Sequence, residues 1–424
     1  MTSIWNKMKL AFSDPDLRNK MFFVMFALML FRLGATIPVP GVNPMALSRF
    51  FNSNQLLGLM DVLSGGGLSN LSIFMLGVGP YITSSIIMQL LTMIFPSFKE
   101  MYQEAGTAGR LRFSQYARIA SVPLAFFQSL GFLTLLGNNG VLLVGATLFD
   151  KFVMALVVTA GATLLMWIGE LITEYGIGNG LSLLIFSGIV SRIPTTISNL
   201  ALTFDTSQIP TYIAFLVVSI IIIAGVVIIS EAERPIPVTY AKQIRGNKVF
   251  GGASTYLPLR VNQAGVIPII FALSFLIFPQ MLVKFLSTLN NETVKVVSDA
   301  LNSFITNQFV YGLSYFILVV LFTYFYTAVT FDPEAISTNL QKSGAFIPGV
   351  RPGASTSEYL SNVLVRLTLV GSVFLGLIAV LPLIMQAVTG NQSLTLGGTA
   401  LLIVVSVVLE IVRQIDAQVS MREY

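Results

Sequence analysis

The chain has 424 residues, of which 54% are hydrophobic and 10% are charged. Soluble proteins usually carry about 25% charged residues, so this composition indicates a protein with several membrane-spanning helices. There is no cysteine and no histidine in the sequence. This excludes disulfides, thiolate nucleophiles, imidazole bases and nearly all transition-metal sites. The net charge of +5 is spread along the chain, which favours loops facing anionic lipid or partners over a nucleic-acid-binding stripe.

The chain begins with a charged segment that has no small-residue cleavage site before the first apolar run, so we expect this segment to be retained in the cytoplasm. Ten apolar runs then follow, and each is a candidate transmembrane helix. They cover residues 21–37, 73–94, 119–136, 152–172, 177–191, 211–230, 261–283, 309–331, 367–388 and 394–412.

Lysine and arginine are distributed unevenly between the two sides of this ten-span arrangement. One side holds Lys7, Lys9, Arg18, Lys20, Lys99, Arg110, Arg112, Arg118, Arg234, Lys242, Arg245, Lys248, Arg260, Lys342, Arg351, Arg366, Arg413 and Arg422. The other side holds Arg32, Arg49, Lys151, Arg192, Lys284 and Lys295. Cytoplasmic loops carry the excess of positive charge, so both termini are predicted to lie in the cytoplasm.

The stretch before the second span is unusual because an apolar stub, residues 56–63, stops at Gly65, Gly66 and Gly67. A spanning helix needs roughly 20 residues, so the stub is too short to cross. The glycines offer a flexible joint between the stub and the full span. Irregular backbone at membrane depth needs protein or a water-filled cavity around it, so a stub folded beside its own helix predicts a lumen. A surface amphipathic turn is the alternative.

A short repeat links the two parts of the chain: GVGPYI at 77–82 returns as GVIPII at 265–270. The first lies on the second span, predicted to run inward, and the other on the seventh, predicted to run outward. Proline-containing helices at corresponding places are typical of inverted-repeat membrane proteins with a central pathway. We therefore predict two inverted five-helix halves, residues 1–204 and 205–424.

Charged residues within the spans are few. Arg32 lies about five residues from the predicted outer end of the first span, where snorkelling to the interface is favoured over a functional ion pair. Glu170 and Glu410 lie near predicted cytoplasmic helix ends. The absence of carboxylates from the predicted midplane counts against a proton relay or a sodium site.

Two cytoplasmic loops, residues 231–260 and 332–366, are longer than simple turns, and loops of more than about 15 residues are usually functional or disordered. Arg351 lies in the second, within IPGVRPG, where proline stiffens and glycine turns the backbone around one cation. This pattern is typical of a docking tip, and a solvated basic loop is the alternative.

Six motifs together closely resemble the SecY family, whose members form the main subunit of the protein-conducting channel of bacterial membranes. They are IPVPG at 37–41, LSIFMLGVGPYI at 71–82, GIGNGLSLLIF at 176–186, YLPLRVNQAGVIPIIFA at 256–272, IPGVRPG at 347–353 and GGTALLIVV at 397–405. The resemblance covers essentially the whole chain. It implies an all-α clamshell of ten transmembrane helices around an hourglass pore, in the bacterial cytoplasmic membrane, without enzymatic activity or a cofactor.

The resemblance also implies a ring of apolar side chains at the constriction of the pore. Motif by motif, the ring falls on Val78, Ile82, Leu181, Ile185, Ile270 and Ile403. All six are aliphatic, as a constriction that seals by dewetting requires. Taken singly, each is more typical of an ordinary packing or lipid-facing residue.

Two further parts of the channel are implied. The stub and its glycines, residues 56–70, match the plug that closes the outer half of the pore, and the residues concerned are Leu56, Leu57, Leu59, Met60, Val62, Leu63, Gly65, Gly66 and Gly67. Spans two, three, seven and eight match the lateral gate through which a signal sequence reaches lipid. Its polar candidates for hydrogen bonds across the closed seam are Thr83, Gln89, Gln128, Asn262 and Gln263.

The implied partners are the small membrane subunits SecE and SecG, the SecA ATPase, the ribosome, preprotein signal sequences and membrane lipid. The docking surface falls on Lys242, Arg245, Lys248 and Arg351. Pro235 and Gln243 stand where further arginine is expected, which lowers the charge available to ribosomal RNA.

Three functions are compared: a partner-driven protein channel, a secondary transporter of a small solute, and a structural assembly scaffold. A transporter predicts charged ligands at the midplane, and a scaffold predicts neither lumen nor plug. The chain has no GxxxxGK[ST] phosphate loop, so energy must come from a partner or from the membrane potential.

Overall fold

The computed structural model describes residues 13–41, 61, 64–104, 106–138, 140–142, 147–195, 198, 209–240, 243–245, 248–250, 254–286, 307–389 and 392–420. Each predicted apolar run overlaps one helix in this part of the chain. In order these are α2 (Pro15–Gly34), α5 (Gly79–Ile94), α7 (Gly106–Asn138), α8 (Leu148–Tyr175), α9 (Gly180–Val190), α11 (Ile209–Glu231), α12 (Ile267–Leu286), α14 (Gln308–Thr330), α16 (Ala354–Thr389) and α17 (Gln392–Ser420).

Five of the described helices are long and apolar enough to cross a membrane, or six if a bent pair counts as one span. The bent pair consists of α5 and the short helix α6 (Pro96–Lys99), with a bend of 116° at the break. Phe95 is extended there because the following Pro96 disfavours the helical conformation of the residue before it. A short π-helical turn, η1 (Glu100–Glu104), then leads to α7. The fold is that of a helical membrane protein, and the count of ten spans stays a prediction.

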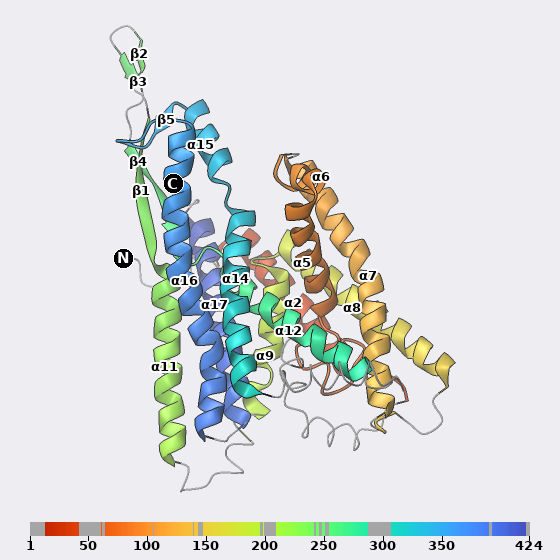
Figure 1. Cartoon of the computed structure of the whole chain (residues 1–424). Coiled ribbons are helices and arrows are strands. Elements are labelled where there is room, and N and C mark those ends of the chain that lie inside the picture. Colours follow the sequence, from red (N-terminus) through yellow and green to blue (C-terminus); the bar gives the residue numbers. More distant parts are fainter. Residues whose placement is uncertain are drawn as a thin grey trace.

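The helices gather in two groups (Figure 1). In one, α2 packs against α8 and α9, and α7 packs against α5 and α8. In the other, α14 packs against α12 and α16, and α17 packs against α11 and α16. Contacts between the groups include α5 with α12, α7 with α12, and α9 with α17. The division into two inverted halves, residues 1–204 and 205–424, stays a prediction.

The repeated motif has the same backbone form in both places. Gly77 and Gly265 adopt positive φ angles of 58° and 61°, which a residue with a Cβ rarely does. The helices begin two residues later, α5 at Gly79 and α12 at Ile267, each with a proline in its first turn. Pro80 and Pro268 therefore start their helices rather than interrupt them, because proline at a helix start loses no hydrogen bond. This is why both helices begin about six residues later than the predicted spans.

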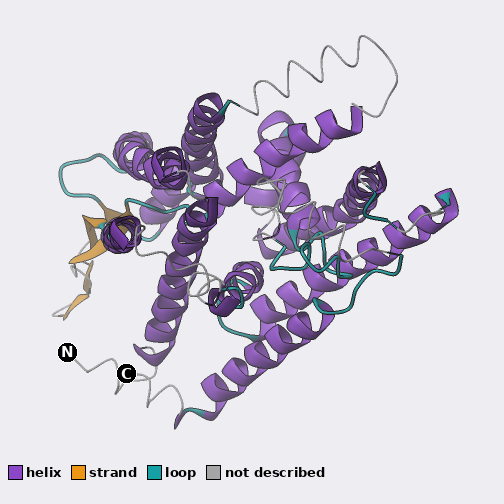
Figure 2. Ribbon diagram, turned by 90° about the horizontal axis from the view of Figure 1, so that it is seen from below, coloured by secondary structure: helices purple, strands orange, loops and turns teal. Residues whose placement is uncertain are grey.

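The two long cytoplasmic loops fold together rather than separately. Strand β1 (Glu233–Tyr240) pairs antiparallel with β4 (Ser254–Arg260), and β5 (Ala345–Phe346), from the second loop, pairs with the far end of β1. A two-stranded extension, β2 (Gln243–Arg245) and β3 (Lys248–Phe250), continues the first loop. Helix α15 (Pro333–Lys342) precedes β5. Figure 2 shows the strands confined to one side of the molecule.

A small apolar core fastens this sheet to the helices. It joins Ile236 and Val238 of β1 to Leu259 of β4, to Ile347 beyond β5 and to Leu360 of α16. Helix α16 begins at Ala354, so the second loop is shorter than the predicted 332–366. The sheet therefore packs on the first turns of α16 and forms an ordered platform there, called the cytoplasmic platform below.

Candidate functional site

The six predicted ring residues come together in one buried apolar cluster. Val78, Ile82, Ile185, Ile270 and Ile403 are members of it, with exposed fractions between 1% and 7%, and Leu181 packs against it. The cluster draws on helices from both groups, so its aliphatic side chains lie between the two parts of the chain. Their arrangement as a ring around a pore stays a prediction.

Local sequence places these side chains. Asn179 caps α9, its side-chain oxygen accepting hydrogen bonds from the backbone N–H groups of Leu181 and Ser182 at 3.0 and 3.3 Å. The helix that follows carries Leu181 and Ile185 one turn apart on one face. Helix α9 packs against α17, which carries Ile403, and α5, which carries Ile82 in its first turn, packs against α12, which carries Ile270 in its first turn. Both contacts cross between the groups.

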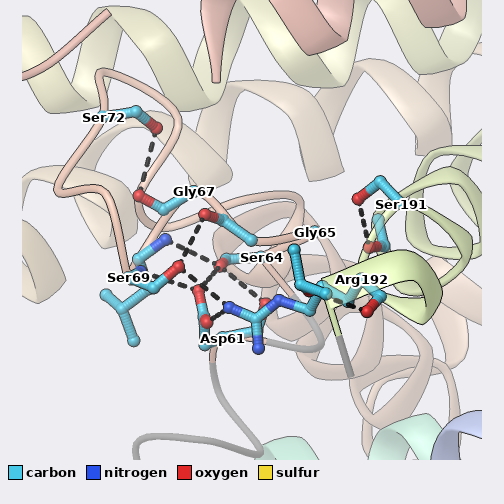
Figure 3. Close-up of polar contacts among 12 residues, drawn as sticks. Asp61, Ser64, Gly65, Gly67, Ser69, Ser72, Ser191 and Arg192 are labelled. Atoms are coloured by element: carbon cyan, nitrogen blue, oxygen red, sulfur yellow. Dashed lines mark hydrogen bonds and ion pairs between the residues drawn. The ribbon is translucent and has the colours of Figure 1, made fainter. Parts of the chain in front are cut away.

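Beside the apolar cluster lies a polar one, built on residues 61–72 (Figure 3). Asp61 is 1% exposed and forms an ion pair with Arg192, just beyond α9. Arg192 also donates from Nη2 to Ser69 Oγ at 2.8 Å, and the Ser69 backbone N–H donates to Asp61 Oδ1 at 2.8 Å. One carboxylate therefore fixes both the backbone of its own segment and the end of a neighbouring helix.

The glycines of this segment are buried in close contacts. A Cβ on Gly65 would lie 2.6 Å from the Phe31 ring, and one on Gly67 would lie 2.6 Å from the Phe74 carbonyl oxygen. Gly65 and Gly66 also have positive φ angles, 70° and 86°. In this structure the glycines thus serve close packing and turning of the backbone. Their predicted role as a joint stays a prediction.

The structure corrects the interpretation of Arg32. Its guanidinium does not reach out alone to the interface: Nη1 donates to the Gly65 carbonyl at 3.0 Å, and Nε donates to Ser187 Oγ at 3.3 Å. A third bond runs from Nη2 to the Ser187 backbone carbonyl. The reason is that α2 packs against α9, which brings the Ser187 and Gly65 acceptor oxygens within hydrogen-bond distance of the guanidinium.

Of the predicted plug residues, Leu56, Leu57, Leu59, Met60, Val62 and Leu63 lie outside the described residues. Among the described residues of the predicted plug, Asp61 is helical and residues 64–70 form turns. From Leu68 onward the segment is held in a second apolar cluster, where Leu68, Leu71 and Met75 pack with side chains of α7 and α8.

The predicted lateral-gate residues lie on elements that meet, since α12 packs against α5, α7 and α14. The hydrogen bonds found for two of them are local, however. Thr83 Oγ1 donates to the Gly79 carbonyl of its own helix at 3.0 Å, and Asn262 Nδ2 donates to the Gly265 carbonyl at 3.3 Å. The side-chain oxygens of Gln89 and Asn262 are buried without a hydrogen-bond partner. Asn262 and Gln263 line a cavity of about 280 Å³ that Asn179 and Glu410 also line.

The docking candidates are placed in part. Arg351 is exposed in a turn held by two bonds: Thr356 Oγ1 donates to the Arg351 carbonyl at 2.8 Å, and Ser337 Oγ donates to the Gly353 carbonyl at 2.6 Å. Arg245 and Lys248 are directly paired across the β2–β3 hairpin. Lys242 lies outside the described residues. The turn around Arg351 is thus tied by side-chain hydrogen bonds, and its role as a docking tip stays a prediction.

The sequence analysis missed Asp61, Arg192 and Ser69 as a set. The available signal was an acid in the apolar stretch LLGLMDVL and an arginine directly after the fifth apolar run. Opposite charges at the ends of apolar segments are candidates for pairing, because an isolated charge is costly in such surroundings. Nothing in the spacing says that residues 61 and 192 meet.

These observations define a class: a helical membrane protein whose central aliphatic cluster is shared by two groups of helices, with a polar cluster beside it. The SecY family model matches residues 72–412. Protein translocase subunit SecY of Mycobacterium bovis is 42% identical over 96% of this chain and 96% of its own length. The same subunit from Thermotoga maritima is 42% identical over 99% and 97%, and that from Staphylococcus aureus is 40% identical over 97% of each chain. The chain belongs to the SecY family.

Solved structures agree on the fold. One described as "The structure of a protein conducting channel" has a TM-score of 0.65 and 20% identity, over 95% of this chain and 92% of that one. Sec61 in the canine ribosome-channel complex from the endoplasmic reticulum has a TM-score of 0.62 and 19% identity, with the same coverage.

Proposed function

We propose that this chain forms the protein-conducting channel of a bacterial Sec translocase. It moves unfolded preproteins across the cytoplasmic membrane and releases membrane segments sideways into lipid. One observation carries this proposal: six aliphatic residues, each located by motif, belong to or pack against a single cluster built from both groups of helices. Family membership supports the same function, and it does not support a solute transporter.

An aliphatic constriction suits this task for two physical reasons. Alkyl side chains cannot replace the hydration shell of an ion, so a narrow collar of them stays dry and blocks leakage. The same side chains offer no hydrogen bonds or charges, so an extended chain of any sequence passes without a specific contact holding it. The collar therefore blocks ions by staying dry, and it does not select preproteins by their sequence.

The lateral gate is assigned to the seam where α12 meets α5 and α7. Interhelical hydrogen bonds in membranes average only about 0.6 kcal/mol, so a seam held by apolar packing with few such bonds can separate for a hydrophobic signal helix. The side-chain oxygen of Gln89, on α5, is buried without a hydrogen-bond partner, which is consistent with few polar ties on this helix. We place signal-sequence recognition there.

The cytoplasmic platform is assigned to partner docking. Strand β5 ties the second loop, which carries Arg351, to β1 of the first loop, and Arg245 and Lys248 lie on the separate β2–β3 hairpin of that first loop. A rigid turn presents the Arg351 side chain with little entropy to lose on binding. We propose SecA and the ribosome as the partners of this surface, SecE and SecG as the small membrane subunits, and a topology with both termini in the cytoplasm.

A stalled preprotein tests the pore assignment. The chain has no cysteine, so single cysteines at Ile82, Ile270 or Ile403 give an unambiguous disulfide readout. A preprotein arrested midway by a folded C-terminal domain, with one cysteine in its spanning part, should cross-link to all three. A cysteine at Val217, exposed on α11, is the matched control and should not react. Cross-linking to none of the three, while translocation proceeds, contradicts the assignment.

A further inference from the structure

We propose that Asp61, Arg192 and Arg32 form a polar latch that holds the segment made of Asp61 and residues 64–67 in its closed position. This inference rests on the proposed channel function and adds to it specific residues that position the closing segment. The latch is made of charges, beside a constriction made of alkyl groups. Neither arginine was assigned to the closing segment by sequence, because both come from other helices.

The first support is the number of separate ties on one short segment. Arg192 pairs with the Asp61 carboxylate and donates to Ser69 Oγ at 2.8 Å. Arg32 donates to the Gly65 carbonyl at 3.0 Å and to Ser187 of α9. The segment is thus gripped by two guanidinium groups, one from the end of α2 and one from the end of α9. Both arginines lie at helix C-termini, where the dipole favours a cation.

The second support is burial. Asp61 is 1% exposed, and its carboxylate also receives the Ser69 backbone N–H. A buried ion that loses its partner keeps its desolvation cost without the compensating attraction. A partial shift of the segment that separated Asp61 from Arg192 would therefore leave the Asp61 carboxylate buried and unpaired. The latch favours two positions, fully seated or fully released.

The third support is the apolar anchoring that begins at Leu68. Asp61, Gly65 and Ser69 bond to the arginines, while Leu68 and Leu71, close to Ser69 in the chain, are buried in the separate apolar cluster with α7 and α8. A Cβ on Gly66 would lie 3.5 Å from Arg192 Nε and 3.9 Å from Arg32 Nη1, so the glycines lie directly against the latch. We place the end of the releasable part at the glycines, because Leu68 and Leu71 anchor the following residues, Ser69 included, to their own group of helices.

This placement couples the latch to the state of the constriction. Attraction between charges falls steeply as the surrounding dielectric rises. While the constriction is dry, the Asp61–Arg192 pair is strong. Once a translocating chain wets the pore, water solvates both ions and the tie weakens. The segment is then released after the seal is breached, and it reseats when the pore dries.

The test measures seating directly. Ser64 is 4% exposed, and serine to cysteine is nearly isosteric, so Ser64→Cys in this cysteine-free chain reports release of the segment. An impermeant maleimide is added to the outer face of resting spheroplasts. In the otherwise unchanged chain the thiol should be protected. Asp61→Asn or Arg192→Gln should raise the labelling rate by about tenfold or more, and Arg192→Lys, which keeps the charge, should restore most of the protection.

A matched control breaks a different ion pair of the same group of helices. Glu170→Gln removes the partner of Arg118, 2.5 Å away, without touching the segment, and should leave the thiol protected. The double variant Asp61→Asn with Arg192→Gln leaves neither charge unpaired, so its labelling should rise by less than the product of the two single effects. Each variant is also assayed for preprotein import, which shows that it is assembled.

The outcomes separate the two proposals. If the single variants import preproteins while the thiol stays as protected as in the unchanged chain, the latch is wrong and the channel stands. If Glu170→Gln raises the labelling rate as much as Asp61→Asn or Arg192→Gln does, the latch is also wrong. Loss of an unrelated ion pair would then release the segment equally well. If the unchanged chain imports nothing, the proposed channel function fails, and the labelling still decides whether the segment is held by this ion pair.

Discussion

Gly65 and Gly188 lie in backbone contact: a Cβ built on Gly188 would stand 2.1 Å from the Gly65 Cα. Gly188 belongs to α9, and Gly65 belongs to the segment held by Arg32 and Arg192. Two glycines face each other here because any side chain on α9 at this point would push the segment out of its seat. The close approach also brings the Gly65 carbonyl within reach of Arg32.

Gly188→Ala should therefore loosen the segment. The new methyl group meets backbone on the other side, which cannot move aside as a side chain can, and overpacking of this kind costs about 1–3 kcal/mol. We expect faster labelling at Ser64→Cys and a lower melting temperature in detergent. Gly131→Ala is the control, because nothing lies within 4 Å of its added Cβ. If Gly188→Ala and Gly131→Ala give the same labelling rate and the same melting temperature, the contact between Gly65 and Gly188 does not hold the segment in place.

Asparagine at the constriction should make the closed channel leak. Replacing Ile82, Ile270 or Ile403 puts a hydrogen-bonding amide into a cluster whose seal depends on dryness, so water enters more easily and ion conductance in planar bilayers rises. A weaker closed state also needs less from a signal sequence, which shifts the equilibrium only by its differential affinity. Preproteins with damaged signals should then be exported.

The control for these three variants is Val217→Ala on α11, whose side chain is 47% exposed. It should change neither conductance nor signal selectivity. If the asparagine variants conduct no more than the unchanged chain and still reject damaged signals, the three isoleucines are packing residues and line no gate.

Reversal of charge at Arg351 should impair export without unfolding the protein. The side chain is exposed, so Arg351→Glu should change the free energy of unfolding by less than about 1 kcal/mol. Partner binding depends on complementary charge, and we expect a roughly tenfold or greater fall in SecA-driven export. Arg366→Glu, a charge reversal on the same predicted cytoplasmic side of the membrane, is the comparison variant. Normal export by Arg351→Glu would remove this residue from the mechanism.

The membrane topology can be tested with single cysteines. Ser355→Cys, in the first turn of α16, should react with an impermeant maleimide only from the cytoplasmic side. Asn199→Cys, between the fifth and sixth apolar runs, should react only from outside. The reason is the concentration of Lys and Arg in the predicted cytoplasmic loops. Labelling of Ser355→Cys from outside intact cells would invert the arrangement.

Much of the fold was predictable from local pattern. Apolar runs located the helices because a spanning segment must be long and nearly uncharged. The starts of α5 and α12 were placed too early, because the residues before Pro80 and Pro268 are apolar but are shaped into a turn by Gly77 and Gly265. The pairing of β5 with β1 had no local signal, since it joins two loops about 100 residues apart in the chain.

The candidate site, like the fold, was predictable from the sequence only in part. Residues in distinctive motifs, such as Ile82 in GVGPYI and Ile270 in GVIPII, were located by resemblance, and the structure places both in one cluster. Asp61 and Arg192 lie in no such pair of matching motifs and are 131 residues apart in the chain. Their contact depends on the packing of α2, α8 and α9, which composition and periodicity do not specify.

Import into vesicles tests the central claim most directly. The chain is reconstituted with SecE and SecG in liposomes, and a radiolabelled preprotein is added with SecA and ATP. The account predicts protease-protected preprotein that requires ATP and an intact signal sequence, with none in liposomes lacking the chain. Complete assembly of the complex with no protected preprotein, under conditions where the Staphylococcus aureus relative imports it, would contradict the claim that this chain is a protein-conducting channel.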